Sequence, residues 1–292
     1  MRIALTGANG QLGHALQRGL GTTHELVLLN HDALELGKPT AVETIVQTQA
    51  ELVLHSAAYT NVDGCARDPA LAYLINGLGT RYVALACQQL NVPMVYFSTN
   101  EVFAGNQQQP YLEYDPPAPI NAYGRSKAAG EAAVRELLTR FYIVRVAWLF
   151  GGERNFVRTV LRLANANPKG EIRMVADEIG SPTYSDDVAE AVLKLIEMPF
   201  YGTYHLVNDG ACSRYELAQE ILRRGGYPDV RLKPTTLCEY QRDSTPPPRS
   251  VLANIAGAAL GLQPRAWQEA LYAFMHRIQM SSATPMAKPP QP

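Results

Sequence analysis

A glycine-rich loop directly after a short apolar segment constrains the fold of this chain more than any other feature. Residues 3–6 are mostly apolar, and Gly7, Gly10 and Gly13 follow in the pattern G-x-x-G-x-x-G. Glycines at this spacing allow a tight turn and a close approach of the backbone to a pyrophosphate at the N-terminus of a helix. The loop therefore predicts a strand, a nucleotide-binding turn and a helix at the start of a parallel sheet.

The first half of the chain alternates short apolar segments with segments of helical character, which is typical of a parallel sheet covered by helices. We predict strands at 3–6, 26–29, 52–56, 94–98, 142–146 and 203–207, and helices at 11–19, 40–49, 70–90, 126–138 and 215–223. The last strand is expected to return to the sheet after an excursion. The pattern indicates an α/β fold, a Rossmann-type doubly wound parallel sheet with a smaller C-terminal substrate-binding lobe.

The order of these segments also predicts how the chain is divided. Residues 1–150 and about 186–208 are expected to form an NAD(P)-binding Rossmann domain. Residues of about 151–185 and 209–280 are expected to form the substrate-binding lobe. The proline-rich residues 281–292 are expected to be a disordered tail.

Composition excludes several classes of function. The 26 basic and 27 acidic residues give a formal charge of −1, which predicts no nucleic-acid or anionic membrane partner. No apolar stretch is long enough to span a bilayer, and no signal peptide precedes the first strand. The four cysteines lack C-x-x-C spacing and the six histidines do not cluster, so we expect reduced thiols, no metal site and a cytoplasmic location.

A tyrosine and a lysine four residues apart, Tyr123 and Lys127, form the pattern Y-x-x-x-K. On a helix they lie one turn apart, where the ammonium can lower the pKa of a phenol from its usual value of about 10. Such a tyrosine can protonate a carbonyl oxygen while a nicotinamide delivers hydride to the carbon. Thr99, at the end of the fourth strand, can hydrogen-bond the same oxygen, although a buried threonine can equally satisfy a backbone carbonyl.

The cofactor is predicted to be NADP(H) or NAD(H). The second strand ends at Asn30, His31 and Asp32, which give neither the acid that binds a ribose 2′-hydroxyl nor the arginine that accommodates a 2′-phosphate. The missing acid at the strand end favours NADP or dual use. The predicted cofactor-binding residues are Gly7, Asn9, Gly10, Gln11, Leu12, Asn30, His31, Ala57, Ala58, Tyr59, Asn76, Tyr123 and Lys127.

Several longer runs carry a resemblance to a known family. They read A-A-Y-T-N-V-D at 57–63, R-V-A-W-L-F-G at 145–151, G-S-P-T at 180–183 and G-T-Y-H-L at 202–206. With the glycine loop, Thr99 and Y-x-x-x-K, they resemble the dTDP-4-dehydrorhamnose reductases of the extended short-chain dehydrogenase/reductase superfamily, over about residues 2–278. The resemblance implies reduction of the C4 ketone of dTDP-4-dehydro-L-rhamnose by NAD(P)H, giving dTDP-L-rhamnose.

The resemblance also implies roles for individual residues. Tyr123 would be the proton donor, Lys127 would tune it and hold the nicotinamide ribose, and Thr99 would polarise the C4 oxygen. Trp148 would pack on the sugar, although from the residues alone it is more typical of a core position. The predicted substrate-binding residues are Thr99, Asn100, Glu101, Tyr123, Trp148, Asn155 and Arg249, with Arg249 and Arg154 as candidates to bind the diphosphate.

Three departures from the family pattern concern the identity of the sugar. The family's S-T-D-Y-V-F-D-G reads S-T-N-E-V-F-A-G at 98–105, its D-Q reads Asp177-Glu178, and an expected arginine is Pro246, with Arg249 nearby. A sister dTDP-4-keto-6-deoxyhexose reductase of a secondary-metabolite pathway is therefore an alternative. A catalytically silent nucleotide-binding regulatory subunit, similar to that of methionine adenosyltransferase, is another, and an epimerase or dehydratase a third. The expected partner is a small-molecule nucleotide sugar, with a homodimer possible.

Overall fold

The larger part of the computed structural model, which describes residues 1–283, is built on a six-stranded sheet in the order β10-β5-β4-β3-β1-β2. All its neighbouring strands are parallel. The strands are β1 (Arg2–Thr6), β2 (Glu25–Leu29), β3 (Leu52–His55), β4 (Met94–Thr99), β5 (Phe141–Val146) and β10 (Gly202–His205). The predicted Rossmann-type sheet is confirmed, including the return of its last strand.

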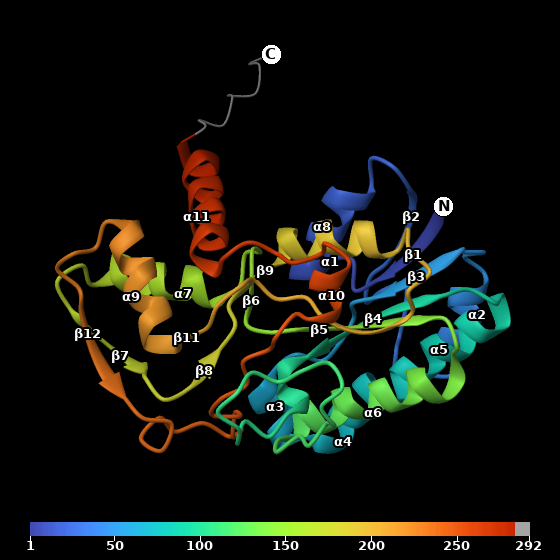
Figure 1. Cartoon of the computed structure of the whole chain (residues 1–292), viewed down its shortest axis with the longest axis horizontal. Helices are drawn as coiled ribbons and strands as arrows, with labels where there is room; N and C mark the ends of the chain where they lie inside the picture. The colour runs from blue at the N-terminus through green and yellow to red at the C-terminus, as the bar shows by residue number, and fades with distance from the viewer. Residues whose placement is uncertain (284–292) are drawn as a thin grey trace, which may run out of the picture.

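Helices cover both faces of this sheet (Figure 1). One face packs against α1 (Gln11–Leu20) and α8 (Ser185–Leu195), and the other against α2 (Thr40–Val46), α5 (Gly79–Leu90) and α6 (Ala122–Leu137). The buried side chains of α1 include Leu12, Leu16 and Leu20, which recur every four residues and form one apolar stripe. The sheet is thus buried on both sides, which leaves its carboxyl edge as the place for a ligand.

Two predicted helices differ from those observed. The helix predicted at 70–90 is divided into α4 (Pro69–Tyr73), the π-helical turn η1 (Leu74–Leu78) and α5. The π-turn carries Asn76, whose side chain is hydrogen-bonded to the loop after β3, so a tertiary contact accompanies the change in winding. The helix predicted at 126–138 begins earlier, at Ala122, because Asn121 caps it by accepting a hydrogen bond from Gly124 N.

The remaining elements form the smaller lobe, at the left of Figure 1. Its strand pairs are β7 (Glu171–Val175) with β12 (Arg231–Thr235), β8 (Ile179–Gly180) with β11 (Cys212–Ser213), and β6 (Leu149–Phe150) with β9 (Thr183–Tyr184). Its helices are α7 (Phe156–Ala166), α9 (Arg214–Gly225) and α11 (Trp267–Ala283). They enclose their own apolar cluster, separate from the clusters on the sheet.

Short elements connect these parts, namely α3 (Val62–Arg67), η2 (Asn100–Val102) and α10 (Ala256–Ala259). Helix α11 runs to Ala283, into the predicted tail, and the rest of that tail, 284–292, lies outside the described residues. Within residues 1–283 no helix has the length and hydropathy to cross a membrane.

Candidate active site

The glycine loop between β1 and α1 packs closely against neighbouring backbone. Gly7 has a φ of +68°, and a Cβ there would lie 2.6 Å from the backbone nitrogen of Ala57. A Cβ on Gly13 would lie 2.3 Å from the carbonyl oxygen of Gly7. No side chain caps the N-terminus of α1, so its first N–H groups remain able to bind an anion.

The turn after β2 is shaped by Asn30. Its Oδ1 accepts hydrogen bonds from the backbone nitrogens of Asp32 at 3.1 Å and Ala33 at 3.0 Å. His31 and Asp32 are exposed. The predicted contact of Asn30 and His31 with the cofactor therefore stays a prediction. The turn exposes one imidazole, that of His31, and one carboxyl group, that of Asp32.

Asn76 joins the loop after β3 to the helix that carries Tyr123. Its Oδ1 accepts from Tyr59 N at 2.8 Å, and its Nδ2 donates to Tyr59 O at 3.1 Å and to Ser126 Oγ at 2.9 Å. Ser126 Oγ in turn donates to Tyr123 O at 2.8 Å. Because the amide has partners on both atoms, the structure gives Asn76 a positioning role beside its predicted contact with the cofactor.

Three residues of the predicted reaction centre meet where β4 ends and α6 begins. Thr99 is the last residue of β4, and its side chain acts on the phenol of Tyr123 in the first turn of α6. The Thr99 hydroxyl donates to Asn100 Oδ1 at 3.2 Å. Lys127 lies one turn further along and is only 2% exposed. Its Nζ is 4.2 Å from the centre of the Tyr96 ring, a cation–π distance. The arrangement places an acid, a hydrogen-bonding hydroxyl and an ammonium group at the carboxyl edge of the sheet.

The pKa values of this centre differ from the sequence expectation in one respect. Burial lowers the pKa of Lys127 to about 7, and the charge of Glu131 opposes that shift. The pKa of Tyr123 is raised, first by burial and next by the charge of Glu101, with the Thr99 hydrogen bond acting in the opposite direction. The expected lowering of the Tyr123 pKa by Lys127 is therefore wrong for this structure, because desolvation is the larger effect. At neutral pH the phenol holds its proton.

A buried ion pair lies behind Lys127. Glu131, one turn further along α6, is fully buried and pairs at 2.8 Å with Arg145 of β5. Burial alone would raise the pKa of Glu131, but the hydrogen bonds and charge of Arg145 outweigh it and hold that pKa below its usual value. Ser98 Oγ donates to the same carboxylate at 2.6 Å. The pair fixes α6 against β4 and β5, and its carboxylate favours the charged form of Lys127.

Glu101 is a half-buried carboxyl group beside Tyr123. Its backbone nitrogen donates to Thr99 Oγ1 at 3.2 Å, and its Oε2 accepts from Asn121 Nδ2 at 2.7 Å. Burial raises its pKa, the Asn121 hydrogen bond opposes the shift, and Glu178 of the lobe adds to it. The neighbouring Asn100 donates from Nδ2 to Ser250 Oγ at 2.6 Å. Asn100 and Glu101, which both depart from the family pattern, therefore lie at the junction between the sheet and the lobe.

Trp148 follows β5 with a strained backbone. The φ angle of Trp148 is +40°, a value that residues other than glycine rarely adopt. Its indole packs so closely on Gly180 that a Cβ on that glycine would lie 2.5 Å from the ring. The guanidinium of Arg214 lies 3.5 Å from the centre of the Trp148 ring and 3.1 Å from Glu178. Sequence reasoning missed Arg214, since a charge at the start of a helix has no distinguishing pattern.

The other predicted ligand residues have partners of their own. Asn155 caps α7 by accepting from Arg158 N at 3.1 Å, and its Nδ2 donates to Gly152 O at 2.6 Å. Arg249 Nε donates to Gln108 O at 2.9 Å, and Arg154 is exposed. The contacts of these three residues with the substrate stay predictions. Two other cations, Arg214 and Arg242, lower the pKa of Glu101 by their charges.

A segment after β12, residues 236–248, crosses from the lobe to the sheet domain, and we call it the crossing segment. Arg242 pairs at 3.1 Å with Asp63 of α3, whose carboxylate also accepts from Ser244 N. Asn121 Nδ2 donates to Thr245 O at 3.0 Å, so one amide contacts both Glu101 and the crossing segment. This segment thereby joins the lobe to the N-terminus of α6.

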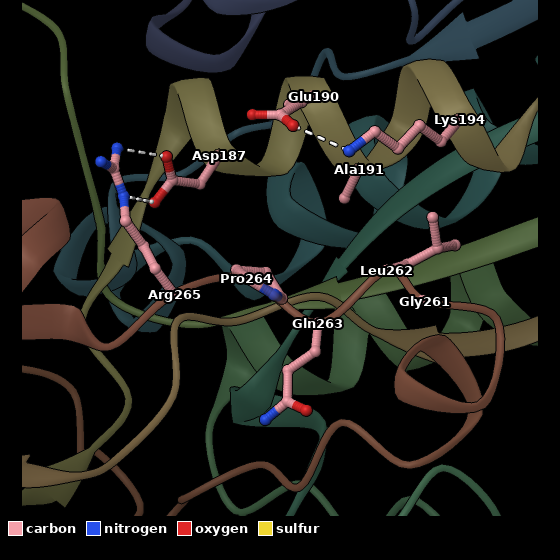
Figure 2. Close-up of a pocket in the computed structure, with 9 residues that line it drawn as sticks. All are labelled: Asp187, Glu190, Ala191, Lys194, Gly261, Leu262, Gln263, Pro264 and Arg265. Carbon is pink, nitrogen blue, oxygen red and sulfur yellow. Dashed lines mark hydrogen bonds and ion pairs between the residues drawn. The ribbon is translucent and has the colours of Figure 1, made fainter.

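A surface cavity of about 290 Å³ lies elsewhere, between α8 and residues 261–265. Figure 2 shows its charged residues facing one another, Arg265 with Asp187 and Lys194 with Glu190, so they are paired. Within residues 1–283 no three potential metal-binding side chains gather into a site.

Known proteins resemble the chain over almost its full length. The family model described as the RmlD substrate binding domain matches residues 1–280. The spore coat polysaccharide biosynthesis protein SpsK of Bacillus subtilis is 40% identical over 277 residues, covering 94% of this chain and 96% of that protein. A probable dTDP-4,6-dihydroxy-2-methyloxan-3-one 4-ketoreductase of Streptomyces antibioticus is 37% identical, covering 93% of each chain. The dTDP-4-dehydrorhamnose reductase of Bacillus anthracis, solved in complex with NADP, is 39% identical with a TM-score of 0.91, covering 94% of this chain and 99% of that chain.

Proposed function

This chain belongs to the dTDP-4-dehydrorhamnose reductase family, and from that premise we propose that it reduces the 4-keto group of a dTDP-linked 6-deoxy sugar with NADPH. One observation carries the proposal. Thr99, at the end of β4, and the protonated Tyr123, in the first turn of α6, lie together at the carboxyl edge of the sheet, with Lys127 one helical turn further along. That edge is where ligands of open parallel sheets bind.

The roles of the residues follow from this geometry. The ketone oxygen would lie against Thr99 Oγ1 and the Tyr123 phenol, which polarise the carbonyl group. Bound NADPH supplies the hydride for the carbonyl carbon. Tyr123 donates its proton to the oxygen, and the ammonium of Lys127 stabilises the phenolate that remains. A phenol with a raised pKa suits this direction of reaction, because it is fully protonated before the transfer and an alkoxide is the stronger base.

The glycine loop and Lys127 would hold the cofactor. The uncapped N-terminus of α1 and the tight turn that Gly7 and Gly13 allow suit its pyrophosphate, and Lys127 would contact the nicotinamide ribose. NADPH is favoured over NADH by the absence of an acid directly at the end of β2. Asp32 lies three residues after that strand.

Binding of the sugar would use the junction between the domains. Trp148 and Arg214, which are stacked on each other, would contact the sugar nucleotide from the side of the lobe. The rhamnose precursor is our first candidate. The 37% identity to a 4-ketoreductase acting on another dTDP sugar favours a sister deoxy sugar as the second. Asn100 and Glu101 lie where the two substrates would be distinguished.

We also propose a homodimer in the cytoplasm. The exposed apolar side chains of Leu71, Tyr73 and Leu74, on α4 and the π-turn, support a dimer face. The free thiols of Cys65, Cys87, Cys212 and Cys238 support a reducing compartment.

The test is nicotinamide consumption by purified protein with enzymatically prepared dTDP-4-dehydro-L-rhamnose, using NADPH and NADH in parallel. We expect turnover with NADPH, and a loss of about 100-fold or more in Tyr123→Phe, because the proton donor is removed. Tyr114→Phe is the matched control, since Tyr114 is 80% exposed. Binding of NADPH without consumption in the wild type would contradict the rhamnose assignment, and equal turnover by Tyr123→Phe would contradict the mechanism.

A further inference from the structure

One carboxyl oxygen of Glu101 accepts a hydrogen bond that orients the side chain, and the other oxygen accepts none from the described residues. Oε2 accepts from Asn121 Nδ2 at 2.7 Å, whereas Oε1 accepts no hydrogen bond from any residue in the described range 1–283. Within the same range no lysine, arginine or histidine forms an ion pair with this carboxylate, unlike Glu131 or Glu178. The group is therefore oriented but not neutralised.

The neighbours of Glu101 come from both domains. On the sheet side, its charge acts on the phenol of Tyr123 and the thiol of Cys65. On the lobe side, Glu178, Arg214 and Arg242 act on the carboxyl group itself. Through its backbone nitrogen it is tied to Thr99, 3.2 Å from Oγ1. Glu101 thus lies between the residues that bind the ketone oxygen and the lobe that binds the rest of the sugar.

We propose that Glu101 is a second acid/base group of this site, which removes and returns a proton on a carbon next to the substrate ketone. The proposal rests on the proposed function, since it requires a keto sugar with its carbonyl oxygen at Thr99 and Tyr123. The protein would then exchange an α-hydrogen of its substrate with solvent, in addition to reducing the ketone.

The chemistry balances without a further reactant. The C–H bond next to the ketone breaks, its proton goes to Oε1 of Glu101, and its electron pair forms the C=C bond of an enolate. Negative charge on the enolate oxygen is stabilised by hydrogen bonds from the Thr99 and Tyr123 side chains. Return of a proton from Glu101 to the same face of the carbon restores the ketone, with no change in oxidation state.

The surroundings of Glu101 make its carboxylate a stronger base than that of an exposed glutamate. Burial and the charge of Glu178 raise its pKa, and the Asn121 hydrogen bond and the charges of Arg242 and Arg214 oppose that rise. A carboxylate with a raised pKa is a stronger base than an exposed one, and it exchanges its proton with water more readily in the operating range.

The experiment follows deuterium incorporation into dTDP-4-dehydro-L-rhamnose in D₂O. The full-length protein is supplied with NADP⁺, so that no hydride is available, and the sugar nucleotide is analysed by mass spectrometry and proton NMR. We expect incorporation next to the ketone well above the rate without protein, and a loss of about 100-fold in Glu101→Gln. Glutamine retains an oxygen for Asn121, so the backbone arrangement is kept. Circular dichroism and NADPH binding check its folding.

A pH profile separates a chemical role of Glu101 from a structural one. In Glu178→Gln the neighbouring negative charge is removed while Glu101 remains, so the pKa of Glu101 falls and the rise of exchange with pH moves to lower pH. A structural effect would change the rate without moving the profile.

Each outcome decides the proposal. Wild-type protein that reduces the sugar with NADPH but exchanges no hydrogen overturns it and leaves the reductase intact. Undiminished exchange in a folded Glu101→Gln variant also overturns it. Exchange without reduction supports it and contradicts the reductase, whereas neither activity contradicts both.

Discussion

At the scale of single residues, Lys127 combines a function with a cost in stability. Its ammonium is buried beside the Tyr96 ring, and burial lowers its pKa from 10.5 in the unfolded chain to about 7. The cost of burying the charge is complete below about pH 7 and disappears above the unfolded pKa, because both states are then neutral. The contribution of Lys127 to stability therefore rises with pH between these two values.

Replacement of Lys127 by Met should consequently stabilise the fold while it abolishes reduction. We expect the free energy of unfolding near pH 7 to increase by about 1–3 kcal/mol in urea titrations, less than the pKa shift alone implies, since methionine loses the cation–π contact. In the wild type, kcat/KM should decrease as the pH rises above about 7, because the stabilising ammonium loses its proton.

The matched control for this prediction is Lys194→Met, on the exposed surface of α8. Lys194 is paired with Glu190 and half-exposed, so its replacement should change stability by less than about 0.5 kcal/mol. A Lys127→Met protein less stable than Lys194→Met, or a wild-type rate that rises steadily above pH 7, would contradict this account of the buried ammonium.

At the scale of elements, the N-terminus of α6 brings the catalytic groups together. Asn121 caps the helix by accepting from Gly124 N at 2.7 Å, and the same amide donates to Glu101 and to Thr245 O. Asn121→Ala should lower the free energy of unfolding by about 1 kcal/mol, as the loss of a cap usually does, and should also reduce kcat. Denaturant titration and steady-state kinetics measure the two effects.

Ser213→Ala provides the comparison. Ser213 caps α9 in a capping box with Glu216, so its removal should cost a similar amount of stability. Because α9 carries no group of the proposed proton transfer, kcat should change much less. Equal losses of kcat in the two variants would show that the Asn121 effect is only one of stability.

The elements also show how far the sequence could predict the structure. Short continuous apolar segments identified the six strands of the sheet, because burial on both faces requires continuous apolar residues. The two-residue strands β6, β8, β9 and β11 are too short to produce any periodic pattern. The π-turn at Leu74–Leu78 was missed for a related reason, since helical periodicity does not report one extra residue per turn.

In the candidate site, the residues that belong to local motifs were predictable from the sequence, and those that the fold brings from the lobe were not. Thr99, Tyr123 and Lys127 were found because they belong to local motifs whose spacing carries chemistry. Arg214 and Arg242 were missed because the fold alone brings the lobe to Glu101 from more than a hundred residues away. The balance of pKa shifts was also out of reach, since it depends on burial that no motif encodes.

At the scale of the whole molecule, the polar contacts that join the lobe to the sheet domain include two groups centred on aspartates. Asp186, at the start of α8, pairs with Arg18 of α1 and with Arg277 of α11. On the opposite side of the junction, Asp63 of α3 holds Arg242 and Ser244 of the crossing segment. Only the second contact lies on the same segment that contacts Asn121, and so it is the one connected to the proposed sugar site.

This difference predicts how ligands stabilise the protein. NADPH would bind the sheet domain, whereas the nucleotide sugar would contact both domains, so each should raise the melting temperature separately by mass action. Asp63→Ala removes a half-exposed ion pair worth about 1 kcal/mol or less, and the melting temperature without ligand should change little. The shift with dTDP or the sugar nucleotide should decrease, because the crossing segment is no longer held beside α6.

Differential scanning fluorimetry with NADPH, with dTDP and with both ligands tests this prediction. Asp63→Ala should retain the NADPH shift of the wild type and lose a large part of the dTDP shift, and its KM for the sugar should rise more than its kcat falls. A loss of both shifts in equal measure would mean that Asp63 supports the fold as a whole. Retention of both would mean that the crossing segment takes no part in binding, and that the lobe holds the sugar through Trp148 and Arg214 alone.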